Sequence, residues 1–202
     1  MSEPAIRRMT ADEFLDWCQH QEGRYELVDG MPVAMTGARR VHDRLTGNAL
    51  GMLYGLLRGH RCHLFTADTG VRIPAGNIRR PDAGIDCGSF KPNETWADAP
   101  FLVLEVLSPS TRTFDLFDKV EEYKTIESLR HILLVDPDMP EVRHWSRIPD
   151  TPWTQTTRLG LDATIPLPDL PGTLDLATLY EGLTFAPRPR LVLEEIPSFR
   201  SR

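Results

Sequence analysis

Residues 101–107 read Phe-Leu-Val-Leu-Glu-Val-Leu, an apolar run that contains a single acidic residue, Glu105. A short continuous apolar run of this kind is typical of a strand buried on both faces of a sheet. An unpaired carboxylate on such a strand costs several kcal/mol, so it is normally neutralised, paired with a cation or bound to a metal. The run therefore predicts a central strand and marks Glu105 as a candidate functional residue.

Three further charged residues lie in short motifs on either side of this strand. They are Glu26 in RYELVDG (24–30), Asp82 in RRPDAGID (79–86) and Lys119 in FDLFDKVEEY (114–123). A strand pair can bring Asp82 and Glu105 together although 23 positions separate them in the sequence. Carboxylate oxygens completed by water suit octahedral Mg²⁺, which can activate a water and stabilise charge on a phosphoryl oxygen. A nearby lysine can position or deprotonate that water, so these residues predict a metal-dependent hydrolase site.

The N-terminal part of the chain predicts a helix followed by a hairpin. Thr10-Ala-Asp-Glu13 fits a capping box, which begins a helix of about ten residues. Asp29-Gly30 stands between the short apolar runs 25–28 and 31–35, and this arrangement is a strong hairpin signal. Pro32 in the second run indicates an edge strand.

A second helix is predicted from residue 41 to residue 57, where apolar residues recur at helical spacing. Gly47, Gly51 and Gly55 follow one another at four-residue intervals and share one face of this helix. We expect that face to pack closely on a sheet, because polar neighbours make a membrane span implausible.

The remaining elements predict one mixed sheet. A polar segment at 108–113 ends the central strand and offers an N-cap to a helix over 114–126. Residues 142–145 and 153–157 predict a hairpin, and 175–180 a short helix. Further strands are predicted at 62–66, 69–73, 83–87 and 131–135. The order of elements predicts an α/β (α+β) fold with a mixed sheet flanked by helices.

The chain has 202 residues, enough for one domain with a sizeable core. We expect that domain to span 1–185 and the proline-rich residues 186–202 to form an extended or disordered tail. The first residues lack the apolar segment of a signal peptide, and no run approaches the ~20 apolar residues of a membrane span, which predicts a cytoplasmic protein without a membrane partner. Cys18, Cys62 and Cys87 are widely spaced, so we expect three reduced thiols.

The formal net charge of −6 opposes strong non-specific attraction to nucleic acid, although it allows a local basic surface. Arg39 and Arg40 lie close together, as do Arg79 and Arg80, and either pair can contact phosphate or belong to a solvated charged face. His42 opens the predicted long helix, where it can face a phosphate or cap the helix.

Taken together, these motifs resemble a known family. Pro81-Asp82, Glu105 and Lys119 resemble the PD-(D/E)XK nuclease superfamily. More narrowly, the stretches 24–30 and 105–111 (EVLSPST), followed by Asp115, Lys119 and Tyr123, resemble the Uma-two family of restriction-endonuclease-like proteins. The resemblance covers about residues 8–180.

This resemblance implies a restriction-endonuclease-like mixed sheet and a DNA endonuclease that depends on Mg²⁺ or Mn²⁺. Asp82 and Glu105 would bind the metal, Lys119 would be the catalytic lysine, and Glu26 would bind the metal directly or through water. Many enzymes that cut both strands of a duplex are two-fold dimers, so a homodimer is expected. In the usual superfamily motif, the lysine stands two residues after the second acid, where this chain has Leu107.

Two other functions are compatible with the sequence. The chain can be a catalytically inactive nuclease fold that serves as a binding or regulatory module, which Leu107 and the acidic net charge favour. It can also be a metal-dependent hydrolase of a small phosphoester. The individual residues have structural alternatives as well: Glu26 on an exposed hairpin, Asp82 in a turn, Glu105 in a buried ion pair, and Lys119 on a solvated helix face.

Overall fold

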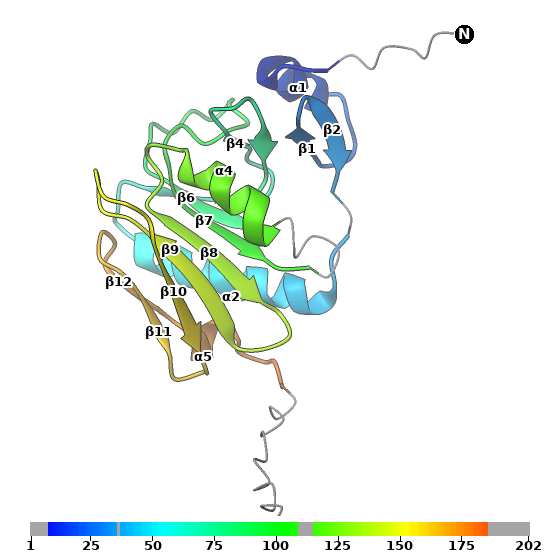
Figure 1. The fold of residues 1–202 in the computed structure, drawn as a ribbon. Helices are drawn as coiled ribbons and strands as arrows, with labels where there is room; N and C mark the ends of the chain where they lie inside the picture. Colours follow the sequence, from blue (N-terminus) through cyan, green and yellow to red (C-terminus); the bar gives the residue numbers. More distant parts are fainter. Residues whose placement is uncertain (1–7, 36, 109–114, 186–202) are drawn as a thin grey trace, which may run out of the picture.

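A computed structural model describes residues 8–35, 37–108 and 115–185 of the chain, with backbone only at 115 and 116. The central element is a six-stranded sheet of order β10-β9-β8-β7-β6-β3, in which only the β7–β8 pair is parallel. A smaller sheet has the order β2-β1-β5-β4, and β11 pairs with β12 (Figure 1). The predicted mixed α/β architecture is therefore confirmed.

The helices and strands have the following bounds. They are α1 Ala11–Cys18, β1 Tyr25–Val28, β2 Met31–Ala34, α2 Arg40–Leu57, β3 His63–Thr66, β4 Val71–Arg72, β5 Ile78–Arg79, β6 Ala83–Asp86, β7 Pro100–Val106, the π-helical turn η1 Asp115–Lys119, α4 Val120–Lys124, β8 His131–Asp136, β9 Glu141–Ser146, β10 Thr154–Leu159, β11 Thr164–Leu167, β12 Gly172–Asp175 and α5 Leu176–Leu179.

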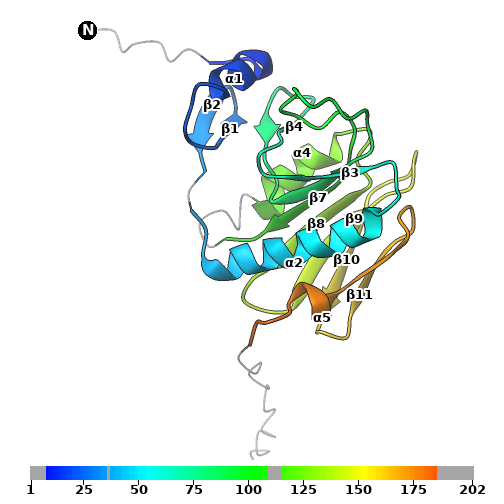
Figure 2. The same ribbon diagram turned by 180° about the vertical axis from the view of Figure 1, so that it is seen from behind.

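Helices cover both faces of the six-stranded sheet. In Figure 1 α4 crosses the near face, and the reverse view in Figure 2 shows α2 across the opposite face with β11 and α5 beside it. Alternate residues of β7 serve the two cores: Leu102 and Leu104 belong to the cluster with α2, and Val103 to the cluster with α4. Burial on both faces explains why the β7 sequence is almost continuously apolar.

Several predictions from local sequence are confirmed. The Thr10 side chain accepts from the Glu13 amide and the Glu13 side chain accepts from the Thr10 amide, which is the predicted capping box. Asp29 and Gly30 both have positive φ (49° and 77°), as the tight β1–β2 hairpin requires. Pro32 lies in β2, an edge strand of the smaller sheet. The hairpin β9–β10 and the short helix α5 also form as predicted.

The prediction for the α2 glycines is wrong. A Cβ added at Gly47, Gly51 or Gly55 would meet no atom within 4 Å, so this face of the helix is open rather than packed on a sheet. The buried residues of α2 are instead three leucines and one alanine, namely Leu45, Ala49, Leu53 and Leu57. Four-residue spacing defines a helix face, but only tertiary packing decides which face is buried.

The expectation of three reduced thiols is also wrong. Cys62 and Cys87 form a disulfide with Cα atoms 4.1 Å apart, and Cys18 is the free cysteine. The β3–β6 register pairs His63 with Asp86, so the two cysteines stand opposite each other one position beyond the paired strands. Their separation of 25 residues gave no indication of this pairing, because it depends on strand register.

Two predictions fall outside the described residues: the N-cap segment after residue 108 and the tail 186–202. The predicted helix over 114–126 is present as η1 and α4, and its first turn is π-helical rather than α-helical. None of the helices in the described part of the chain is long and apolar enough to span a membrane.

Candidate active site

Lys119 lies between two buried carboxylates. Its Nζ is 3.1 Å from Oε1 of Glu26 and 3.2 Å from Oε1 of Glu105. All three residues are nearly inaccessible to solvent, with exposed fractions of 7% for Glu26, 5% for Glu105 and 6% for Lys119. At this depth the ammonium compensates two carboxylates that would otherwise be costly to bury.

Three separate elements deliver these charges to one place. Glu105 is on β7, near its carboxyl end, and Lys119 ends the π-helical turn that leads into α4. Glu26 is on β1 of the smaller sheet, where β1 pairs with β5 (Leu27 opposite Ile78). Along the chain β5 is followed by β6, a strand of the six-stranded sheet. Lys119 therefore joins the two sheets as well as the two glutamates.

Leu107 occupies the position at which the usual superfamily motif has a lysine, and its surroundings in this protein are apolar. It is 2% exposed and belongs to the apolar cluster under α4, together with Val120 and Tyr123. A lysine there would have to bury its charge in that apolar cluster. In this chain the ammonium comes instead from Lys119, which the turn η1 carries to the same carboxylate.

Tyr123 is the second group that holds Glu105. It is fully buried, and its hydroxyl donates a 2.7 Å hydrogen bond to Glu105 Oε1. Burial, together with the negative charges of Glu105 and Glu26, raises the pKa of Tyr123 well above its ordinary value. The hydroxyl therefore keeps its proton and remains a donor to the carboxylate.

A buried arginine supports Glu26 from the other side. Arg79 is 1% exposed; its Nη1 lies 3.5 Å from Glu26 Oε2, and its Nη2 donates to Glu122 Oε1 at 2.7 Å. Burial alone would lower the pKa of Arg79, but the bond to Glu122 and the charges of Glu122 and Glu26 raise it. Asn77 also donates to Glu122, so a continuous polar network runs from α4 to β1.

Asp82 lies just before β6 and is mostly buried. Its Oδ2 accepts the backbone N–H of Val106 at 2.7 Å and lies 3.1 Å from Nε2 of His42, in the first turn of α2. The β6–β7 register pairs Ala83 with Leu104, so the next position places Asp82 across from Glu105. The two adjacent strands therefore bring the positions of these two acids opposite each other, as a strand pair was expected to do.

A divalent ion at this cluster would have few protein ligands. Among the described residues there is no group of three or more His, Cys, Asp or Glu side chains arranged to hold a metal. Asp82 and Glu105 supply two carboxylates, and Mg²⁺ is commonly bound by one or two carboxylates with water and substrate phosphate completing the shell. Glu26, the third predicted ligand, is engaged with Lys119, Arg79 and the amide of Arg80.

The predicted basic surface is only partly present. Arg79 and Arg80 are 1% and 7% exposed, and Arg80 donates to the carbonyls of Tyr25, Ala67 and Asp68. Buried side chains with protein partners cannot contact a phosphate backbone, so the expectation for this pair is corrected. Arg39, which pairs with Asp138, and Arg40 are exposed at the start of α2.

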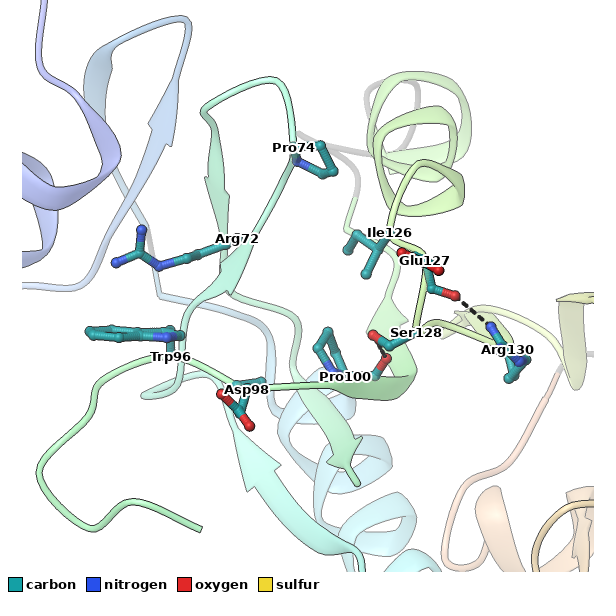
Figure 3. A pocket seen from close by; sticks show the side chains of 10 residues that line it. Arg72, Pro74, Trp96, Asp98, Pro100, Ile126, Glu127, Ser128 and Arg130 are labelled. Carbon is teal, nitrogen blue, oxygen red and sulfur yellow. Dashed lines mark hydrogen bonds between the residues drawn. The ribbon is translucent and has the colours of Figure 1, made fainter. Parts of the chain in front are cut away.

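A shallow pocket lies at the opposite end of β7 from this cluster. It holds about 480 Å³, and Figure 3 shows Trp96 beneath Arg72 on one side and Ile126 and Ser128 on the other. Arg72 stacks 4.3 Å from the centre of the Trp96 ring and pairs with Asp12. The pocket contains none of the predicted site residues.

Sequence reasoning missed the supporting network. Tyr123 was named only as part of the family motif, and Arg79 was expected on the surface rather than beside Glu26. Glu122 and Asn77 carried no signal in the sequence, because their role depends on long-range contacts. Glu122 bonds Arg79 across 43 positions and Asn77 across 45 positions.

A comparison with solved structures identifies a similar fold. A solved structure described as a putative nuclease belonging to DUF820 from Anabaena variabilis matches with a TM-score of 0.66 and 18% identity, over 85% of this chain and 97% of that one. The chain therefore shares the fold of that structure, a mixed sheet flanked by helices.

The particular family follows from the sequence match. The chain belongs to the Uma2 family, described as "Putative restriction endonuclease", whose model matches residues 11–179. Two uncharacterized proteins of Synechocystis sp. are also similar: one is 26% identical over 180 residues (88% of this chain, 94% of the relative), and the other 29% over 161 residues (78% and 91%).

Proposed function

We propose that this protein is a divalent-metal-dependent endonuclease that hydrolyses phosphodiester bonds of DNA. The observation that carries the proposal is the buried contact of Lys119 with Glu105, beside Asp82 at the carboxyl end of β7. A carboxylate pair with an adjacent ammonium is suited to hydrolysis at phosphorus, where negative charge increases in the transition state.

Each residue has a distinct role in this proposal. Asp82 and Glu105 would hold Mg²⁺ or Mn²⁺, which when bound would polarise a phosphoryl oxygen and acidify a water. Lys119 supplies fixed positive charge, Glu26 and Arg79 keep Lys119 in position, and Tyr123 orients Glu105. Arg39, Arg40 and His42, at the start of α2, are the proposed contacts to the nucleic-acid backbone.

The test is cleavage of supercoiled plasmid, linear duplex, single-stranded DNA and RNA by the full chain, with Mg²⁺, Mn²⁺ or EDTA. We expect metal-dependent DNA cleavage that falls on the order of 100-fold or more in Glu105→Gln and Lys119→Met. Lys91→Met, a lysine variant in the remote loop after β6, should cleave normally. Wild type that is inactive on every substrate with both metals, or variants that remain active, would overturn the proposal.

Metal binding is tested separately by calorimetry on the wild type, Asp82→Ala and Glu105→Ala. Loss of Mn²⁺ binding in both variants supports the assignment of the two ligands. Unchanged binding in both shows that the ion binds elsewhere and removes Asp82 and Glu105 from the proposed metal site.

A second candidate function is a nuclease-fold binding module without catalysis. Lys119 neutralises both glutamates, and the described residues contain no cage of three metal ligands, so the cluster is also suited to a purely structural role. DNA binding by a protein that neither binds metal nor cleaves would favour this alternative. In either case we propose that the chain acts as a homodimer.

A further inference from the structure

Strand β10 presents an unpaired edge in the part of the chain that the structure describes. It pairs with β9 over six consecutive residues without a bulge and lies at the end of the six-stranded sheet (Figure 1). No described strand pairs with its outer edge. Such an edge offers a row of backbone N–H and C=O groups to any compatible strand.

Most of the other edge strands have protections that β10 lacks. Pro32 interrupts β2, and Pro166 interrupts β11. β4 has two residues and β3 has four, and the ring of Phe90 packs 5.3 Å from the ring of His63 on β3. Short strands and proline are common protections of sheet edges.

The composition of β10 favours strand pairing. It reads Thr-Gln-Thr-Thr-Arg-Leu, without proline, glycine, lysine or a carboxylate, and it is rich in β-branched residues. Every residue except Arg158 is exposed, and Leu159 is 46% exposed. The strand therefore has one neighbour and both faces largely in solvent, an arrangement that leaves apolar and backbone groups available to a partner.

We propose that β10 pairs antiparallel with β10 of a second copy of this chain, which joins two six-stranded sheets across a two-fold axis. Residues that stand opposite each other in an antiparallel pair share one face of the sheet, so the two-fold axis must pass through a residue that faces its own copy. In the register centred on Thr156, Thr156 faces Thr156 of the partner subunit, Gln155 faces Thr157 of the partner subunit, and Arg158 faces Thr154 of the partner subunit. Thr–Thr pairs are favourable cross-strand neighbours, and no like charges meet.

A second copy satisfies this edge better than an unrelated strand, because two-fold symmetry makes each contact twice. The single charge of β10 lies off the axis, so self-pairing does not bring Arg158 against its own copy. The inference supplies an interface for the proposed homodimer, and it uses none of the proposed catalytic residues. Its failure would therefore leave the nuclease proposal intact, and the reverse also holds.

The test is the mass of the full chain by analytical ultracentrifugation over a concentration series. One chain is 22.9 kDa, so a dimer of 2 × 22.9 = 45.8 kDa is expected for the wild type. The variant Q155K/T157K places each introduced lysine opposite an introduced lysine of the partner subunit and should raise the dissociation constant at least tenfold. The variant Q155K/T157E should restore the dimer, because each introduced lysine then faces an introduced glutamate of the partner subunit.

A charge-matched control is T164K/T173K, which adds two lysines to exposed positions of β11 and β12. It should keep the wild-type mass, and thermal melts of all variants should show that they fold. A wild-type protein that stays at 22.9 kDa at high concentration would overturn the inference. So would a Q155K/T157K protein that remains a dimer, because the interface would then lie on another surface.

Discussion

The hydroxyl of Tyr123 and the ammonium of Lys119 both contact the same oxygen of Glu105, at 2.7 Å and 3.2 Å. The two donors are four residues apart and come from one continuous helical segment, while their acceptor is on the sheet. The helix therefore orients the carboxylate that the strand supplies. This relationship makes the position of α4 relative to β7 a determinant of the site.

Replacing Tyr123 with phenylalanine should disturb the orientation of the Glu105 carboxylate without changing the other charged side chains of the site. The variant removes one buried hydrogen bond to a charged group, which costs about 1.5–3 kcal/mol of stability. We expect DNA cleavage to fall at least tenfold while the protein still folds. Denaturant unfolding and cleavage rates measured on the same preparation check both effects.

Tyr180→Phe is the matched control for this prediction. Tyr180 is also buried, and its hydroxyl donates to the carbonyls of Asp136 and Glu141. It should lose similar stability with little loss of activity. Equal loss of activity in both variants would mean that destabilisation, rather than the orientation of Glu105, explains the effect.

Arg79→Met should destabilise the protein strongly, because it leaves the carboxylates of Glu26 and Glu122 without their buried partner. Removing one member of a buried ion pair typically costs about 3–5 kcal/mol. The comparison is Arg24→Met, which removes the exposed Arg24–Asp68 pair (60% and 71% exposed) and should cost less than about 1 kcal/mol. Urea unfolding of both variants measures the two losses of stability. Equal losses would contradict the assignment of Arg79 to a stabilising buried ion-pair network.

The Cys62–Cys87 disulfide should contribute substantially to stability. It closes a loop of 25 residues, for which the chain-entropy relation gives about 3.5 kcal/mol. For a domain of this size, its loss should lower the Tm by roughly 7–14 °C. Thermal melts with and without reductant, and of Cys62→Ala/Cys87→Ala, measure the effect, with Cys18→Ala as control. The prediction fails if the unreduced, unfolded chain exposes three reactive thiols instead of one.

Acid should destabilise the protein through a buried histidine pair. Nδ1 of His131 lies 3.0 Å from Nε2 of His144. Burial and the charge of Arg130 lower the pKa of His131 to about 4. Burial and the charges of His131 and Arg158 lower the pKa of His144 to about 4. In the unfolded chain both should bind protons near pH 6.5. The unfolded state therefore binds more protons between about pH 6.5 and 4, and stability falls as the pH falls through that range.

The size of this effect should be on the order of 1–3 kcal/mol over the range, seen by chemical denaturation at a series of pH values. His131→Asn/His144→Gln should flatten the dependence. His20→Gln, at an exposed position, should leave it unchanged. A double variant with the wild-type slope would assign acid sensitivity to other groups, such as the carboxylates.

Much of the fold was predictable because its signals are local. The Thr10–Glu13 capping box, the Asp29-Gly30 turn and the apolar spacing of α2 each depend on a few neighbouring residues. Glu105 was recognised for the same reason, since a single acid in an apolar strand needs a partner wherever the strand lies. The identity of that partner was not local, and spacing alone suggested only a metal or a nearby cation.

The sequence by itself determined most of the helices and strands, the family motif and the candidate acids, because periodicity, turn chemistry and an anomalous charge are properties of short segments. The strands β5, β11 and β12 were not predicted. Only the tertiary structure decided which charges meet inside the protein. Lys119 pairs with Glu26 across 93 positions, and Arg79 with Glu122 across 43. Strand register and helix docking set those distances, and burial makes each pairing obligatory, since an ion removed from water must find its counter-charge.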